Sequence, residues 1–267
     1  MKLSLVDAFT DVPFAGNPAA VCLLDRDASA SWRQSVAREL GYSETAFLRP
    51  LGSDAIEIRW FTPTMEVDLC GHATLASAHF LWEGKIAMAG RPIRFESKSG
   101  SLFARGSEGA IELDFPEETA REVPPPSGIV DALGVDPRWF GRNRLDYLVL
   151  VERESEVRGL RPDFARLATA CSEGRGVMVT ARSEDPAFDF VSRFFAPSSG
   201  IDEDPVTGSA HCCLGPFWAE RLGKNDLRGF QASARGGAVS VRTRGNGRVY
   251  LGGAAVTIFR GELAVPE

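Results

Sequence analysis

The sequence, 267 residues long, lacks the features that identify several classes of protein. No window approaches the roughly 18 consecutive apolar residues that a transmembrane helix requires, so we expect no membrane partner. Only four residues separate Lys2 from Asp7, which is too short for the core of a signal peptide, and we expect a cytoplasmic protein. The five cysteines are odd in number, and Cys212 and Cys213 are adjacent, which argues against a disulfide framework.

The chain also lacks an excess of basic residues. The chain has 30 Lys and Arg against 36 Asp and Glu, a formal net charge of −6. Because phosphate backbones are bound by basic surfaces, nucleic acid is not an expected partner. Apolar residues make up 44% and charged residues 25%, which is typical of a soluble globular protein. The length suits one large domain or two of about 130 residues.

An internal repeat favours two domains. Residues 59–63 (RWFTP) recur as residues 193–197 (RFFAP), about half the chain later, and Gly71-His72-Ala73 is echoed by Gly208-Ser209-Ala210. Both copies continue into an apolar run that ends in aromatic residues. Self-similarity of this kind indicates a duplication that produced two similar halves. Residues 117–126 contain three consecutive prolines and are interpreted as the linker.

The hydrophobic pattern predicts an α+β fold in which strands surround one apolar helix in each half. The predicted lobes are residues 1–118, to which the last residues 260–267 return, and residues 127–259. The predicted strands are residues 21–24, 45–48, 56–61, 93–97, 111–115, 147–151, 176–180, 188–195, 239–243, 249–251 and 255–259. The predicted helices are residues 31–40, with a serine cap and Gly41 as the stop, 72–81, 163–169 and 208–222, the last kinked at Pro216.

The two central helices begin where a ligand is easily bound. Each starts at a glycine, Gly71 or Gly208, and a helix N-terminus offers free backbone N–H groups to a carboxylate. If the halves pack with pseudo-twofold symmetry, both N-termini can hold one small carboxylate from two sides. The alternative is that Asp68, Asp204 and Ser209 only cap these helices.

Several sequence blocks, in order along the chain, resemble the PhzF-like family of phenazine biosynthesis proteins. They are Asp7-Ala8-Phe9, residues 16–21 (GNPAAV), residues 43–47 (SETAF), residues 61–63 (FTP), residues 68–74 (DLCGHAT) and residues 202–210 (DEDPVTGSA). The resemblance implies a diaminopimelate-epimerase-like fold with two pseudo-symmetric lobes, each a β-barrel-like sheet around a central helix. It further implies a homodimer and a cofactor-independent isomerase that acts on a small carboxylate between the lobes. The family covers many substrates, so a role in phenazine synthesis does not follow.

The resemblance also assigns site residues. The proton-transferring glutamate of the family falls on Glu44, and its helper residues fall on His72, Asp204 and Ser209. Candidate substrate-binding residues are Asn17, Cys70, Gly71, Ala73, Thr207 and Gly208. A carboxylate in an apolar cleft has a raised pKa and can take a proton from carbon, which agrees with this role for Glu44. The alternative is that Glu44 is a solvated acidic residue at a helix end.

Two further expectations concern the helper residues. The helix N-terminus should depress the pKa of His72 and keep it neutral, and Ser209 should bind substrate rather than attack it. Aligning Phe47 with Met178 through the repeat places Arg175 opposite Glu44, which makes the two halves of the site chemically different.

Cys70 supports a competing hypothesis. Related racemases use two thiols, one before the glycine of each half, but Thr207 stands at the second position, so two-thiol racemisation is excluded. Cys70 is then either a reactive thiol of an epimerase or dehydratase, or a small buried residue. A non-enzymatic metabolite-binding protein is the other alternative. The adjacent His211, Cys212 and Cys213 point to different faces of a helix, and no metal site is expected.

Overall fold

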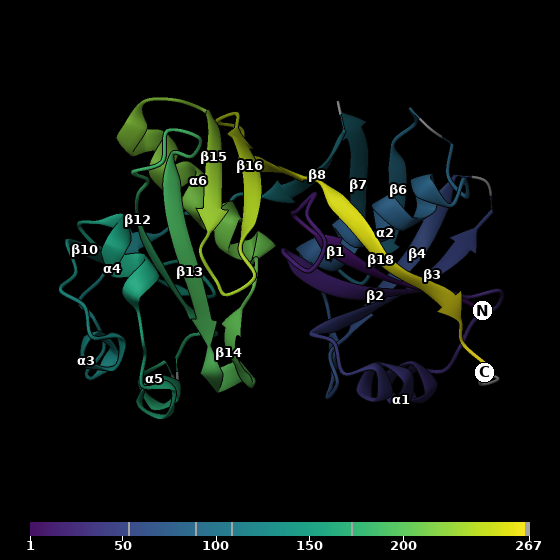
Figure 1. The fold of residues 1–267 in the computed structure, drawn as a ribbon, viewed down its shortest axis with the longest axis horizontal. Helices are drawn as coiled ribbons and strands as arrows, with labels where there is room; N and C mark the ends of the chain where they lie inside the picture. The colour runs from purple at the N-terminus through teal and green to yellow at the C-terminus, as the bar shows by residue number, and fades with distance from the viewer. Residues whose placement is uncertain (53, 89, 108, 172, 265–267) are drawn as a thin grey trace. The chain divides into compact units, whose positions relative to one another are not determined.

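A computed structural model describes residues 1–52, 54–88, 90–107, 109–171 and 173–264, and the chain divides into two compact units (Figure 1). The N-terminal unit contains residues 1–115 and 252–267, and the C-terminal unit contains residues 116–251. The chain leaves the first unit at the end of strand β8 and returns within strand β17. Within the described ranges, no helix is both long and apolar enough to cross a lipid bilayer.

The N-terminal unit is mainly β-sheet. Strand β1 pairs antiparallel with β2, which pairs parallel with β3, and β3 pairs antiparallel with β4. Strand β4 pairs antiparallel with β5 and parallel with β6, and β6, β7 and β8 follow as antiparallel neighbours. The bounds are β1 Lys2–Ala8, β2 Asn17–Leu23, β3 Glu44–Leu51, β4 Ala55–Phe61, β5 Glu66–Val67, β6 Ile93–Ser97, β7 Gly100–Ser107 and β8 Ala110–Pro116.

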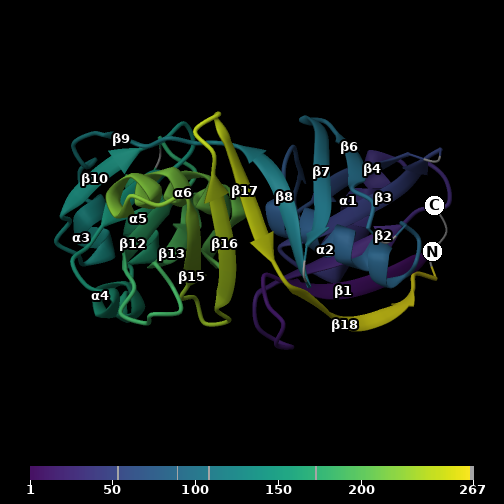
Figure 2. The same ribbon diagram turned by 90° about the horizontal axis from the view of Figure 1, so that it is seen from above.

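The two ends of the chain meet in this unit. Strand β18 (Ala255–Glu262), close to the C-terminus, runs antiparallel to β1 along its whole length, as Figure 2 shows. The register pairs Lys2 with Glu262 and Ala8 with Ala255. Because β1 is bonded to β2 on one side and to β18 on the other, the last strand closes a sheet that the first strand would leave open.

Two helices belong to the N-terminal unit, and local signals set their ends. Helix α1 (Ala30–Leu40) begins where the Ser29 side chain accepts a hydrogen bond from the Trp32 backbone, and it ends at Gly41, which has a φ of 69°. Helix α2 (Gly71–Glu83) is rich in alanine and is buried on most sides, with Ala73, Ala76 and Ala78 fully covered. Small side chains let the surrounding strands approach this helix closely, and it forms the centre of the unit.

The C-terminal unit repeats this arrangement. Strand β10 pairs antiparallel with β11, β11 pairs parallel with β12, and β12 pairs antiparallel with β13. Strand β13 pairs antiparallel with β14 and parallel with β15, which pairs antiparallel with β16. The bounds are β9 Arg121–Glu122, β10 Trp139–Arg142, β11 Tyr147–Leu150, β12 Val177–Arg182, β13 Phe190–Ala196, β14 Ile201–Asp204, β15 Asp226–Gln231, β16 Gly237–Thr243 and β17 Arg248–Gly253. The helices are α3 Ile129–Leu133, α4 Glu154–Gly159, α5 Phe164–Ala170 and α6 Gly208–Leu222, with the short 3₁₀ helix η1 Pro197–Ser199.

The order and direction of these pairings match those of β1 to β7, and α6 occupies the place of α2 in the chain. A structural ion pair is repeated as well. Arg59 binds Glu66 with two hydrogen bonds of 2.6 Å, and Arg193 binds Glu203 with bonds of 2.6 and 2.8 Å. Each pair ties the strand of the RWFTP or RFFAP motif to the next short strand. The predicted duplication and α+β class are therefore confirmed at the level of topology.

Several boundaries differ from the sequence-based prediction. Residues 252–259 group with the N-terminal unit, whereas the prediction returned the chain only from residue 260; of that segment, residues 265–267 lie outside the described residues. The predicted linker is part of the C-terminal unit, because Arg121 and Glu122 form β9 and pair with β10, while the three prolines stay outside any strand. The serine cap of α1 is Ser29, and the helix starts at Ala30, one residue before the predicted start. The bounds of α6 are those predicted, with Pro216 inside the helix.

The prediction also missed helices α3 and α4 and strands β1, β5, β7, β9, β10, β14 and β15. Strand β14 (IDED) is largely acidic, and β15 (DLRGFQ) combines charges with a glycine. Ile201 is the single β-branched residue in the two strands, and neither strand shows the alternation of apolar and polar residues that indicates a strand. Pairing with β13, which is buried along its whole length, holds both of them in place.

The tight turn before Asn17 gives the first testable prediction. Gly16 has a φ of 65°, and a Cβ there would lie 2.2 Å from the Ala8 carbonyl oxygen, whereas Gly41 has a φ of 69° and open space around its Cβ position. Gly41→Ala should cost only the left-handed strain of about 1 kcal/mol, and Gly16→Ala should cost clearly more because the backbone must also move. Urea denaturation of both variants measures the difference, and equal losses would show that the turn at Gly16 adapts freely.

Candidate active site

A buried acid–base pair lies at the start of helix α2. Glu44 is the first residue of β3, opposite Ala19 of β2, and His72 is the second residue of α2. Glu44 Oε2 lies 3.2 Å from His72 Nε2, and their side chains are 14% and 6% exposed. The structure thus brings together the predicted proton-transferring residue, Glu44, and one of its predicted helper residues, His72, in a largely buried contact.

The other ring nitrogen of His72 has two neighbours. Nδ1 lies 3.2 Å from Asn17 Nδ2 and 3.6 Å from Cys70 Sγ, and the Ser43 hydroxyl donates to Asn17 Oδ1 at 3.4 Å. When the ring is neutral, donation from the Asn17 amide to Nδ1 leaves the ring proton on Nε2. When the ring is charged, both nitrogens carry protons. The Asn17 amide can then no longer donate to Nδ1. In either state, Nε2 carries a proton and lies 3.2 Å from Glu44 Oε2, which is the contact of an ion pair and not an aligned hydrogen bond.

The pKa of His72 contradicts the sequence-based expectation. Burial disfavours the charged ring, but the neighbouring Cys70 and Glu44 outweigh this effect and raise the pKa well above its usual value. Because the Cys70 thiol is protonated at neutral pH, we attribute the effect to the Glu44 carboxylate. The expected lowering of the His72 pKa by the helix N-terminus is therefore wrong. The Glu44 carboxylate is in direct contact with the ring and outweighs the effect of the helix end.

Cys70 is a buried thiol. Burial raises its pKa first, and the negative charge of Glu44 raises it further, so the thiolate is disfavoured. It occupies the N-cap position of α2 without accepting a capping hydrogen bond from the helix, and its carbonyl accepts a 2.6 Å bond from the Thr74 hydroxyl. In this environment Cys70 can act as a proton donor but is a poor base.

Within the described residues, Glu44, Cys70 and His72 are close enough to be considered as metal ligands, with their donor atoms within 4.8 Å of one another. Cys70 Sγ lies 3.6 Å from His72 Nδ1 and Glu44 Oε2 lies 3.2 Å from Nε2, so the thiol and the carboxylate approach the same imidazole through different nitrogens. Three protein donors of these types could hold an ion such as Zn²⁺, although the sequence analysis predicted no metal site here.

Asp204 and Thr207 form a braced loop ahead of α6 in the C-terminal unit. The Thr207 hydroxyl donates to Asp204 Oδ2 in a short hydrogen bond. The fully buried Gln231 holds the loop from its other side: its amide donates to the Asp204 carbonyl at 2.7 Å and accepts from the Thr207 backbone at 2.8 Å. Asp204 is therefore presented in a fixed position, and Gly208, which is also buried, opens the helix behind it.

Ser209, the second residue of α6, is half-buried and accepts a 2.7 Å hydrogen bond from Arg175 Nη2. Arg175 also binds the fully buried Asp146 carboxylate, at 3.0 Å through Nε and 2.6 Å through Nη2. Burial raises the pKa of Asp146, and the Arg175 guanidinium opposes that effect. Sequence reasoning noted Arg175 only through the internal alignment and missed both Asp146 and Gln231.

The remaining candidates are placed as follows. Asn17 and Ala73 are fully buried, and Gly71 is the half-buried first residue of α2. His211, Cys212 and Cys213 are buried in α6, where His211 Nδ1 lies 2.8 Å from the Thr207 carbonyl and burial lowers the pKa of His211 to about 4. They are packing residues, as predicted. Asp68 does not cap α2: the N-cap is Cys70, and the Asp68 carbonyl accepts from Ser99.

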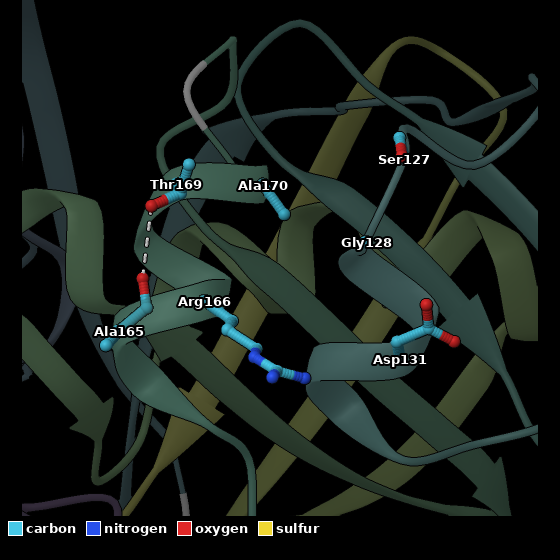
Figure 3. Close-up of a pocket in the computed structure, with 7 residues that line it drawn as sticks. All are labelled: Ser127, Gly128, Asp131, Ala165, Arg166, Thr169 and Ala170. Atoms are coloured by element: carbon cyan, nitrogen blue, oxygen red, sulfur yellow. Dashed lines mark hydrogen bonds between the residues drawn. The ribbon is translucent and has the colours of Figure 1, made fainter.

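A separate pocket of about 480 Å³ lies on the C-terminal unit between α3 and α5 (Figure 3). Its lining consists of Ser127, Gly128, Asp131, Ala165, Arg166, Thr169 and Ala170. Figure 3 shows the Arg166 guanidinium reaching toward α3. The Arg166 charge is already paired with Asp163 at 3.3 Å, and none of the candidate site residues lines this pocket.

Comparison with known proteins identifies relatives along the whole chain. An isomerase of Halalkalibacterium halodurans that has not been characterised is 50% identical over 260 residues, which cover 97% of each chain. The human phenazine biosynthesis-like domain-containing protein is 39% identical and covers 98% of this chain and 99% of its own. Two further relatives from Pseudomonas aeruginosa are also named isomerases. The predicted enzyme class, an isomerase, is confirmed at this level.

Solved structures support the fold. A PhzF-family protein of Enterococcus faecalis superimposes with a TM-score of 0.93 at 39% identity and covers 99% of both chains. A hydroxyproline epimerase of Agrobacterium vitis has a TM-score of 0.64 at 12% identity, with 98% of this chain and 91% of that chain covered, and shows the shared fold alone. The predicted diaminopimelate-epimerase-like fold is confirmed. The family described as phenazine biosynthesis-like protein matches residues 6–261, and the chain belongs to that family.

Proposed function

We propose that this protein is a cofactor-independent isomerase that moves a proton between carbon atoms of a small carboxylate, with Glu44 as the acid and base. The observation that carries the proposal is the buried contact of 3.2 Å between Glu44 and His72. A carboxylate in a largely buried contact with an imidazole can remove a proton from carbon while its position stays fixed. The names of the relatives agree with isomerisation.

The reaction balances without an oxidant or a cofactor. A C–H bond of the substrate breaks, and an O–H bond forms on Glu44. The electron pair that remains on the substrate is delocalised toward its carboxylate. The O–H bond of Glu44 then breaks, and a C–H bond forms at another carbon, which restores the enzyme.

His72 controls the charge of the base in this scheme. Its Nε2 is in ion-pair contact with Glu44 Oε2 at 3.2 Å, and the protonated ring favours the carboxylate form, which is the form that accepts a proton. Asn17 and Cys70 contact the other ring nitrogen and hold the imidazole in place. The general acid–base contribution of such a positioned group is about 10²- to 10⁴-fold in rate.

We further propose that Asp204 and Ser209 act on the same substrate molecule as Glu44. Both are fixed at the start of α6, where the backbone N–H groups of the first turn favour a carboxylate. In this proposal the N-terminal unit transfers the proton, and the C-terminal unit orients the substrate.

The rival reaction, in which Cys70 is the base, is less well supported. Its thiol is buried and has a raised pKa, so little thiolate is available at neutral pH. The matching position in the other unit is Thr207, whose hydroxyl already donates to Asp204. A second thiol is therefore not available to complete an acid–base pair.

The first functional prediction separates these reactions. In D₂O, the wild-type protein should introduce deuterium at carbon into one member of a panel of cyclic and amino carboxylates, detected by NMR. Glu44→Gln should lose at least about 100-fold in this rate because it removes the base, whereas Cys70→Ala should keep most of it. Full exchange by Glu44→Gln together with loss in Cys70→Ala would transfer the base to Cys70. Saturable binding without exchange in any variant would indicate a binding protein.

A second prediction follows from the charge on His72. NMR titration should give His72 a pKa well above the ordinary value near 6.5, and Glu44→Gln should lower it, because the raising charge is lost. The stability that the pair contributes should be fully present below about pH 6.5 and disappear as the pH rises through the folded-state pKa of His72. His211, with its pKa of about 4, serves as a matched buried control that stays neutral from pH 5 to 8. A His72 pKa unchanged in Glu44→Gln would contradict the pair.

A further inference from the structure

Several hydrogen bonds hold the backbone of Arg175 in place. It lies two residues before β12, and its backbone N–H donates to the Leu145 carbonyl at 2.8 Å. The hydroxyls of Ser198 and Ser199 donate to its carbonyl at 3.1 and 3.2 Å. These contacts fix the point from which the side chain leaves the backbone.

The guanidinium is fixed as well. It forms a two-pronged ion pair with Asp146, whose side chain is completely buried, and it lies 5.5 Å above the centre of the Phe194 ring. The carboxylate fixes the direction in which the guanidinium points within its plane, and the aromatic face fixes the tilt of that plane. The remaining Nη2 hydrogen bond then goes to Ser209 Oγ at 2.7 Å.

This bond determines what the Ser209 hydroxyl can do. A guanidinium has donors but no acceptor, so Ser209 must accept from Arg175 and direct its own proton elsewhere. Acceptance from a cation also polarises the O–H bond and makes it a stronger donor. Ser209 is half-buried and the Arg175 side chain is 39% exposed, which leaves this donor accessible.

The repeat makes the comparison with the N-terminal unit direct. The counterpart of Ser209 is His72. The predicted match of Arg175 with Glu44 is wrong by one residue: Thr45 lies opposite Phe61 and Val177 lies opposite Phe195, so the counterpart of Glu44 is Gly176, the neighbour of Arg175. In one unit an anionic side chain contacts the second residue of the central helix, and in the other a cationic side chain does so. The second residue of the central helix is thus set beside a carboxylate in one half and beside a guanidinium in the other.

We propose that Arg175 is a positioning residue which, through Ser209, directs a hydroxyl donor at a carboxylate oxygen of the substrate; this inference rests on the proposed function. Asp146 and Phe194 set the orientation of Arg175. Ser209 then binds a ligand that has an anionic oxygen acceptor more tightly than it binds the neutral amide of the same shape.

The experiment uses benzoate and benzamide as probes and follows the backbone amide of Ser209 by NMR during titration of the full chain. Benzoate should bind the wild type. Its Kd should rise about 10- to 100-fold in Arg175→Met, which is the range for loss of a hydrogen bond to a charged group. Arg175→Lys should restore part of the affinity. Benzamide should bind more weakly and change less, and Arg138→Met, which removes an exposed arginine paired with Glu152 in the same unit, should behave as wild type.

Further measurements distinguish positioning from a general structural effect. Ser209→Ala should weaken benzoate binding to a similar degree. The double variant with Arg175→Met should raise the Kd little further, because both changes remove the same interaction. If Arg175→Met does not fold, the benzoate affinities of Ser209→Ala and Arg175→Lys still test the role of Arg175. With a substrate from the D₂O panel, Arg175→Met should raise KM more than it lowers kcat, since the contact exists before the transition state.

The outcomes separate the two proposals. Carbon–proton exchange that is unaffected by Arg175→Met, or equal losses of benzoate and benzamide binding, would overturn the role of Arg175 and leave the proposed function intact. Failure of benzoate to bind the wild type would also overturn it. Arg175-dependent benzoate binding, without carbon exchange of any carboxylate, would support the inference and remove the isomerase proposal.

Discussion

The contact between Glu44 and His72 is the constraint on which the N-terminal unit depends. It requires the start of β3 and the first turn of α2 to meet within 3.2 Å inside a nearly dry site. The parallel pairing of β2 and β3 brings Glu44 beside the start of β2, and the turn at Gly16 leads into Asn17, which contacts the other side of the imidazole. The alanine-rich surface of α2 allows the strands to approach. Packing, turn geometry and acid–base chemistry therefore converge on a few residues, as is expected where a site is built into the core of a fold.

The duplication shows which parts of the scaffold are structural and which are chemical. Strand order, the central helix and the pairs Arg59–Glu66 and Arg193–Glu203 are present in both units. Even a polar side chain that bonds to the N-cap carbonyl recurs, since Thr74 contacts Cys70 in one unit and His211 contacts Thr207 in the other. The first turn of each central helix is one place where the side chains differ, with Gly71-His72 in one unit and Gly208-Ser209 in the other. The scaffold is thus shared by both units, whereas the polar groups at the helix starts are not.

The sequence predicts well what local physics determines. Gly41 at the end of α1, the glycine starts of α2 and α6, and the repeat itself are all visible in it, and resemblance adds Glu44 and His72 as partners. It fails where partners are distant in the chain. Gln231 braces a loop that precedes it by 24 residues or more, and Asp146 reaches Arg175 across a parallel strand pair. The return of the C-terminus to the first unit was predicted, but β1 was not predicted as a strand, so its pairing with β18 was missed. The charge of His72 was misjudged for the same reason, because a carboxylate 28 positions away in sequence dominates a nearby helix terminus.

An isomerase that returns the proton it removes must solve two problems with different side chains. The base must exist as an anion before it acts, and the substrate carboxylate must meet a donor that is already in place. In the proposed reaction, Glu44 in contact with His72 supplies the base. Ser209, which accepts from Arg175 and directs its own proton elsewhere, supplies a donor that binds the carboxylate before proton transfer begins. A second Glu44 in place of this donor would supply another base and no group to bind the carboxylate. The proposal therefore assigns proton transfer and substrate binding to chemically different halves of the duplication.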